Sequence, residues 1–174
     1  VFSALDASSI YDIPIMFSEQ KIDNFMMKNF NLKDRRLNLK PWRDYKNKVE
    51  KCKTKVKIAM IGKYVDLLDS YKSLNEALYH AGVINNKTVE ITYLDSEKLT
   101  KRNIHQLKEM NGILVPGGFG DRGIEGKILA AEYARVNNIP YFGICLGMQI
   151  SVIEFARNVM KLNKANSTEF DKNT

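Results

Sequence analysis

From residue 56 onward, the apolar positions of the chain follow two regular patterns in turn. Short apolar or alternating runs are typical of strands, whereas apolar residues that recur every three or four positions are typical of amphipathic helices. The runs predict strands at residues 56–61, 89–94, 112–115 and 141–144. The recurring positions predict helices at residues 70–81, 100–110, 124–136 and 146–160, and Gly82 is the expected end of the first helix.

Strands and helices therefore alternate four times after residue 56. This alternation predicts an α/β fold with a parallel sheet and helices on both faces. Ligands bind at the carboxyl ends of the strands in such sheets. Three unusual segments fall at those ends, namely Gly62-Lys63-Tyr64, Pro116-Gly117-Gly118-Phe119-Gly120 and Cys145-Leu146-Gly147.

Residues 1–55 follow a different pattern. Asp12-Ile13-Pro14 is typical of a helix start, and apolar residues at helical spacing follow it. Residues 31–55 are polar and basic, and we interpret them as a linker that Trp42 holds in place. The predicted organisation is a helical tail at 1–30, a linker at 31–55 and an α/β domain at 56–174.

Charge and cysteine content narrow the class of protein. The net charge of +7 fits either a Lys-rich solvated surface or a nucleotide-facing one, and without a dense basic run we expect no nucleic-acid partner. No apolar run approaches the roughly 18 residues that span a membrane. The two cysteines, Cys52 and Cys145, lack metal-site spacing and are too few for a disulfide framework, which favours a reducing, cytoplasmic location and no metal site.

The segment Gly143-Ile144-Cys145-Leu146-Gly147 brings a strand end and a helix start to one residue. Its glycines permit a tight turn like the elbow around a hydrolase serine. The turn exposes the sulfur at a helix N-terminus, which favours the thiolate, and aims the Leu146 N–H at an oxyanion on a bound carbonyl. A buried structural cysteine is the alternative, and the flanking glycines favour the nucleophile.

The glycine-rich segment at residues 116–120 follows the predicted strand at 112–115. Glycines allow the backbone to approach a ligand closely, so the Gly118 N–H is a candidate second oxyanion donor. A simple turn is the alternative, and the nearby cysteine elbow favours the functional interpretation.

Both segments resemble the motifs of the class I, triad-type glutamine amidotransferases. The resemblance implies an incomplete flavodoxin-like domain in which Cys145 attacks the glutamine amide and forms a glutamyl thioester. It also implies oxyanion donation by the Gly118 and Leu146 N–H groups. The implied glutamine contacts are Gly117, Gly118, Phe119 and Gln149.

Further segments are similar to the CTP synthase family. They lie at residues 3–6, 9–14, 62–66, 70–73, 76–78, 122–127 and 166–170, so the resemblance covers nearly the whole chain. It implies a parent ligase of pyrimidine biosynthesis that makes CTP from UTP, ATP and glutamine. It also implies that residues 1–30 end the nucleotide-binding synthetase domain, and that the parent is a homo-oligomer, a tetramer in this family.

The same resemblance assigns roles to individual residues. Glu169 is implied near the glutamine pocket. Arg122, Gly123 and Glu125 are implied in a lid that responds to the activator GTP, and the glycines of this segment suggest a mobile backbone. The alternative is that Glu125 only decorates a helix start, where the dipole favours it. The parent requires ATP and Mg²⁺, and no cofactor is expected on this chain itself.

Two motifs expected of the whole enzyme are missing from the sequence. The triad requires a His-x-Glu pair, yet neither His80 nor His105 is followed two residues later by Glu. There is also no Gly-x-x-x-x-Gly-Lys-Ser/Thr phosphate loop. We therefore expect the chain to be a piece of a longer protein and to be inactive alone.

Two other functions stay open. One is another flavodoxin-like cysteine hydrolase of the peptidase or deglycase kind, against which Gln149 and the Pro116-Gly117-Gly118 loop argue. The other is a catalytically incomplete assembly or regulatory domain that keeps the fold.

Overall fold

The computed structural model describes residues 1–33, 37–63 and 68–174. These residues form two units, Val1–Thr54 with Val83–Thr88 and Lys55–Gly82 with Val89–Thr174, and each is described by itself. Tyr64, Val65 and Asp66, which belong to one of the family-like segments, lie outside the described residues. Among the helices of the described ranges, none is long and apolar enough to cross a membrane.

The first unit is helical. It contains η1 (Ile10–Asp12), α1 (Ile13–Glu19), α2 (Ile22–Asn29) and α3 (Lys40–Lys51). Pro14 lies in the first turn of α1, which agrees with the predicted helix start. Lys21, in a left-handed conformation with φ 58°, separates α1 from α2.

Helix α3 lies inside the stretch interpreted as a linker, where we predicted no regular element. Its sequence is strongly polar, so the helical spacing of its few apolar residues is easy to miss. The Trp42 and Tyr45 rings lie 6.0 and 4.4 Å from the ring of Tyr11, and the Lys46 Nζ lies 2.9 Å from Asp12. These contacts hold α3 against η1, and the Trp42 ring takes part in them. The interpretation of residues 31–55 as a linker stays a prediction.

The second unit is built on a four-stranded sheet. Its strands are β1 (Thr54–Gly62), β2 (Lys87–Asp95), β3 (Gly112–Val115) and β4 (Tyr141–Gly143), in the order β2-β1-β3-β4. Strand β3 pairs in parallel with both β1 and β4. This order matches the start of the flavodoxin-like arrangement, so the predicted fold class is confirmed.

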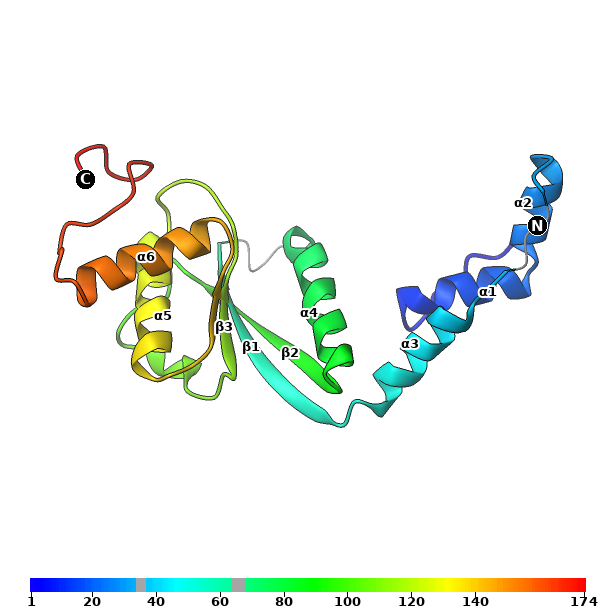
Figure 1. Cartoon of the computed structure of the whole chain (residues 1–174), viewed down its shortest axis with the longest axis horizontal. Coiled ribbons are helices and arrows are strands. Elements are labelled where there is room, and N and C mark those ends of the chain that lie inside the picture. The colour runs from blue at the N-terminus through cyan, green and yellow to red at the C-terminus, as the bar shows by residue number, and fades with distance from the viewer. Residues whose placement is uncertain (34–36, 64–67) are drawn as a thin grey trace. The chain divides into compact units, whose positions relative to one another are not determined.

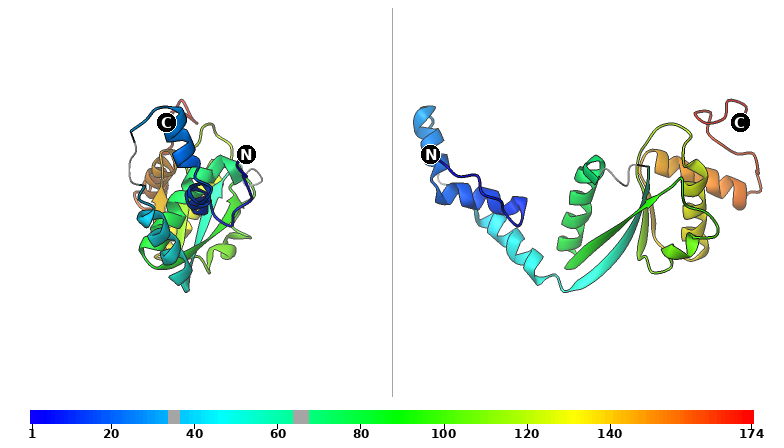
Figure 2. Two further views of the ribbon diagram at one scale, coloured as in Figure 1. Left: turned by 90° about the vertical axis from the view of Figure 1, so that its right-hand side faces the viewer. Right: turned by 180° about the vertical axis from the view of Figure 1, so that it is seen from behind.

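Helices cover both sides of this sheet. Helix α4 (Lys72–Ile84) lies on one side, and α5 (Ile124–Val136) and α6 (Leu146–Asn158) lie on the other (Figure 1). The rotated views agree with this assignment (Figure 2). Met60 and Leu114 face the α4 side, whereas Ala59 and Ile61 pack with Ala130 of α5. Strands buried on both faces explain the continuous apolar runs of the sequence.

Two predicted helices differ from the observed elements. Residues 100–110 form only a short turn, η3 (Ile104–Leu107), because the Asn103 side chain bonds the Thr100 N–H and the Lys98 carbonyl instead of continuing a helix. Helix α4 continues past Gly82 to Ile84, and buried Val83 anchors its last turn. A glycine inside a helix costs only about 1 kcal/mol, which packing readily offsets.

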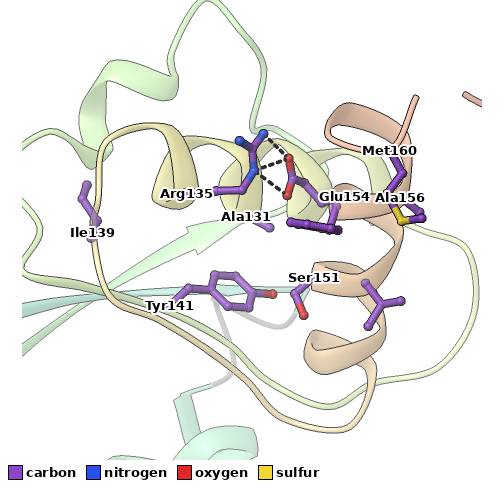
Figure 3. A pocket seen from close by; sticks show the side chains of 10 residues that line it. Ala131, Arg135, Ile139, Tyr141, Ser151, Glu154, Ala156 and Met160 are labelled. Carbon is purple, nitrogen blue, oxygen red and sulfur yellow. Dashed lines mark hydrogen bonds and ion pairs between the residues drawn. The ribbon is translucent and has the colours of Figure 1, made fainter. Parts of the chain in front are cut away.

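A half-buried ion pair joins α5 to α6. Arg135 Nε lies 3.1 and 3.0 Å from the two carboxylate oxygens of Glu154, which is 2% exposed, and Figure 3 shows the two side chains facing each other. Burial pushes the pKa of Glu154 upward, but the hydrogen bonds from Arg135 and Asn158 outweigh it and keep the pKa below its ordinary value. The pair borders an apolar cavity of about 470 Å³ between α5, α6 and β4, which does not include Cys145.

Candidate functional site

Cys145 lies where the sequence places it, between the end of β4 and the start of α6. Its backbone has φ 52° and ψ −108°, a conformation that L-residues rarely adopt, and its side chain is exposed. Such strain persists only where the surroundings impose it, and it clusters at functional sites. Cys145 is therefore an exposed thiol on a strained turn at a helix N-terminus.

Close packing at two glycines imposes this turn. A Cβ added to Gly143 would lie 2.3 Å from the backbone of Gly147, and one added to Gly147 would lie 2.0 Å from the Val115 carbonyl oxygen. The Tyr141 hydroxyl donates to the Gly147 carbonyl over 2.8 Å, and burial raises the pKa of that hydroxyl. Both glycines are thus required by the approach of α6 to β3 and β4.

The glycine-rich loop after β3 lies beside the nucleophile. A Cβ built on Gly117 would lie 3.4 Å from the Cβ of Cys145, and one built on Gly118 would lie 3.7 Å from the Leu146 side chain. Within the described ranges, neither the Gly118 N–H nor the Leu146 N–H donates a hydrogen bond. The predicted oxyanion donors are therefore close to Cys145 and available to a ligand.

Two charged side chains hold this loop in place. The Lys63 ammonium donates to the carbonyl oxygens of Phe119 and Gly120 over 2.7 and 3.4 Å. From another segment, the Glu169 carboxylate accepts the Gly120 N–H over 3.2 Å. Sequence analysis singled out the segment around Lys63 but gave this lysine no role. A cation at the carboxyl end of β1 was the available signal.

Gln149 and Glu169 line one cavity of about 650 Å³ that starts one turn along α6 from Cys145. The structure thus brings together two of the predicted glutamine contacts. Phe119 is 86% exposed and lines a different, smaller cavity together with Gly117 and Gly118. The loop therefore lines the smaller cavity, and the larger one is formed by α6 and residues 166–169.

The predicted lid residues are packed rather than loose. A Cβ on Gly123 would lie 2.2 Å from the Ser96 hydroxyl, and one on Gly126 would lie 1.9 Å from the Ser96 carbonyl oxygen. Arg122 forms an ion pair with Glu97 at 2.5 Å. These glycines allow α5 to approach Ser96 closely. We expected them to make the backbone mobile, and in the structure they instead permit this close packing.

Glu125 lies in the first turn of α5, as the helix-start interpretation expects. It accepts hydrogen bonds from Arg157 of α6 over 2.9 and 3.2 Å. The role of Arg122, Gly123 and Glu125 toward GTP stays a prediction.

Neither histidine is placed as a base for Cys145. His80 lies on α4 with its Nε2 4.0 Å from the Glu76 carboxylate, and His105 lies in η3 with its Nδ1 3.1 Å from the Arg102 carbonyl. Across residues 1–33, 37–63 and 68–174 there is no group of three or more His, Cys, Asp or Glu that could hold a metal ion.

Comparisons with known proteins agree with this geometry. Residues 66–172 match the family described as glutamine amidotransferase class-I. The chain is 52% identical over 172 residues to a CTP synthase of Lawsonia intracellularis and 53% identical over 170 residues to one of Caldanaerobacter subterraneus. These matches cover 98% and 97% of this chain but only 31% and 32% of the relatives, so the chain spans about a third of their length.

A solved structure is also similar. It is the glutaminase domain of Trypanosoma brucei CTPS with bound acivicin, which is 47% identical with a TM-score of 0.63. The match covers 67% of this chain and 46% of that one.

Proposed function

The chain belongs to the class-I glutamine amidotransferase family, and on this premise we propose that it is the glutamine-hydrolysing region of a CTP synthase. The observation that carries the proposal is the strained, exposed Cys145 beside two backbone N–H groups that donate to no acceptor among the described residues. Similarity to CTP synthases along nearly the whole chain supports the choice of parent enzyme.

In the proposed reaction, the Cys145 thiolate attacks the side-chain amide carbon of glutamine. The electron pair of the carbonyl moves to oxygen, and the Gly118 and Leu146 N–H groups stabilise the resulting oxyanion. Collapse of this intermediate expels ammonia, after a proton has been delivered to it, and leaves a γ-glutamyl thioester on the sulfur. Water then hydrolyses the thioester to glutamate and restores the thiol.

Helix α6 assists the nucleophile electrostatically. Its N-terminus carries partial positive charge, which favours a thiolate at Cys145. A proton acceptor is still needed for efficient turnover, and we assign it to a His-x-Glu pair outside this sequence. Without that pair we expect the chain to hydrolyse glutamine very slowly by itself.

The glutamine substrate is proposed to lie between the glycine loop and the cavity of Gln149 and Glu169. That cavity adjoins the first turn of α6, and Glu169 also bonds the loop. The Glu169 carboxylate suits the α-amino group of glutamine, while the Gln149 side chain offers both a donor and an acceptor.

The whole reaction that we propose converts UTP to CTP. ATP and Mg²⁺ act in a synthetase domain that residues 1–30 terminate, and ammonia from Cys145 reaches that domain. GTP activates through Arg122, Gly123 and Glu125, whose side chains at Arg122 and Glu125 are 69% and 78% exposed. We also propose that the parent enzyme is homo-oligomeric and cytoplasmic.

The decisive experiment replaces the nucleophile in the full-length protein. Cys145→Ala should lower glutamine-dependent CTP formation by at least about a thousandfold, because the thioester cannot form. Ammonia-dependent formation should stay unchanged. Steady-state assays with each nitrogen source measure both, and Cys52→Ala is the matched control.

Equal loss of both activities would make Cys145 a structural residue and overturn the proposal. A Cys145 thiol that resists alkylation at neutral pH would instead favour the assembly or regulatory alternative, in which the site is a relic.

A further inference from the structure

Lys127 is a buried lysine that the proposed chemistry does not use. It lies in the first turns of α5 and is only 2% exposed. Its ammonium donates no hydrogen bond and forms no ion pair with any residue that the structure describes. A buried, unpaired ammonium is strongly unfavourable, so a partner for it is expected.

The side chain borders a small cavity at the carboxyl ends of β1 and β3. The cavity measures about 130 Å³, and the glycine loop forms one of its walls. Its other walls are Gly62, Lys63, Tyr71 and Lys127. Since a water occupies about 30 Å³ of liquid volume, the space fits a group of a few non-hydrogen atoms but no whole nucleotide.

The charge around the cavity is positive. Among the described residues that line it, two are lysines and none carries a carboxylate. Burial, followed by the nearby Lys63 charge, lowers the pKa of Lys127 to about 8, while Glu97 opposes this shift. The Glu97 carboxylate is itself paired with Arg122, so it compensates little of the excess positive charge.

We propose that this cavity is a binding site for a phosphate group, held by the Lys127 and Lys63 ammonium groups. Lysine is a common phosphate ligand that acts as a compact point charge, and two lysines match the charge of a phosphate. The cavity also lies where open α/β sheets bind ligands. The phosphate comes either from the free ion or from the end of a nucleotide.

Lys63 links the phosphate site to the glycine-rich loop at residues 116–120. This ammonium already bonds the Phe119 carbonyl, so an anion in the cavity competes for it or fixes it in place. The binding proposal itself does not rest on the proposed glutaminase activity, because it is tested without turnover.

The test measures thermal unfolding of the full-length protein in increasing inorganic phosphate, with chloride keeping the ionic strength constant. Phosphate should raise the midpoint saturably, because a ligand that binds the native state stabilises it. Lys127→Met should abolish the response, and Lys101→Met, which removes an exposed lysine, should retain it. Without phosphate, Lys127→Met should be at least as stable as the parent, since it removes an unpaired charge.

Three results would overturn the proposal: no midpoint shift in the parent, an equal shift in Lys127→Met, or a lower midpoint for Lys127→Met without phosphate. The last result would mean that the chain itself neutralises the ammonium. Calorimetric competition between GTP and inorganic phosphate then separates the two sources. If GTP and inorganic phosphate compete, and Lys127→Met removes this competition, the site binds a phosphate of the nucleotide. If the two bind independently, the site binds the free phosphate ion.

Discussion

In two segments of the second unit, glycines allow a helix to pack closely against its neighbours, but the side chains beside these glycines differ in their surroundings. At the elbow, Gly143 and Gly147 allow α6 to press against the sheet, and the turn leaves the Cys145 sulfur exposed. At residues 122–127, Gly123 and Gly126 allow α5 to press against Ser96, and the charged side chains Arg122 and Glu125 are both paired. Glycines in both segments therefore indicate close approach of a helix, and the segments differ in whether the side chains that they present are exposed or paired.

The largest expected effect tests this shared role of glycine. Gly147→Ala and Gly126→Ala should each destabilise the second unit by about 3 kcal/mol or more, the upper end for overpacking, because each new methyl group meets a backbone oxygen at about 2 Å. Denaturant unfolding midpoints measure the effect.

Gly118→Ala is the matched control for these variants. Its added Cβ would meet nothing closer than 3.7 Å, so stability should change by less than about 1 kcal/mol. If Gly126→Ala were as stable as the parent, residues 122–127 would not be tightly packed. That result would support a lid with a mobile backbone.

A smaller effect, on the rate of glutamine hydrolysis, is expected from replacing Lys63, whose ammonium holds the glycine-rich loop. Lys63→Met should lower the kcat of glutamine hydrolysis about 10- to 100-fold with little change in KM, because loss of a single oxyanion donor typically costs 10²–10³ and here the donor is only displaced. Ammonia-dependent CTP formation should not change. Lys98→Met, at an exposed lysine paired with Asp95, is the control. An unchanged kcat would show that the Lys63 bonds do not position the loop.

The buried lysine of α5 predicts a pH effect on stability. The pKa of Lys127 is about 8 in the folded protein against an ordinary value of about 10.5, so the unfolded chain binds more protons between these values. Stability should therefore rise with pH from about 8 to 10, by at most about 1.4 kcal/mol per unit. Phosphate-free unfolding of the parent and of Lys127→Met measures the difference, and an identical pH profile for the two would contradict it.

The smallest effect on stability is expected at Arg122. Its ion pair with Glu97 is exposed, so Arg122→Ala should cost no more than about 1 kcal/mol. The same variant should lose GTP stimulation of the glutamine reaction while ammonia-dependent synthesis stays near normal. Arg102→Ala serves as the surface control. Normal GTP stimulation in Arg122→Ala would mean that residues 122–127 only form the start of α5 and do not respond to GTP.

Elements bounded by strong breakers were predicted most accurately. The strand at 112–115 and the helix at 124–136 have the predicted bounds, because Gly112, Pro116 and Gly123 mark their ends in the sequence itself. The elbow was predicted for the same reason, since its glycines have a steric purpose that composition reveals. Helix α3 and the turn η3 were missed because tertiary contacts of Tyr11 and side-chain bonds of Asn103 decide them.

The candidate site divides along similar lines. Cys145, Gly118 and Leu146 come together because they follow neighbouring strands, which the order of elements already indicates. Lys63 and Lys127 were not assigned roles, since a lysine in a polar stretch or on a helix is usually solvated. Only packing in three dimensions buries Lys127 and brings Lys63 to the carbonyl of Phe119.

The backbone of Cys145 also bears on how such a domain changes over generations. A residue other than glycine with φ 52° and ψ −108° costs about 1–3 kcal/mol, and that cost persists only where the surrounding structure imposes it. If a descendant of this chain lost its reaction, replacement of Cys145 by glycine would relieve the strain and raise stability. Mutational drift would then favour that replacement.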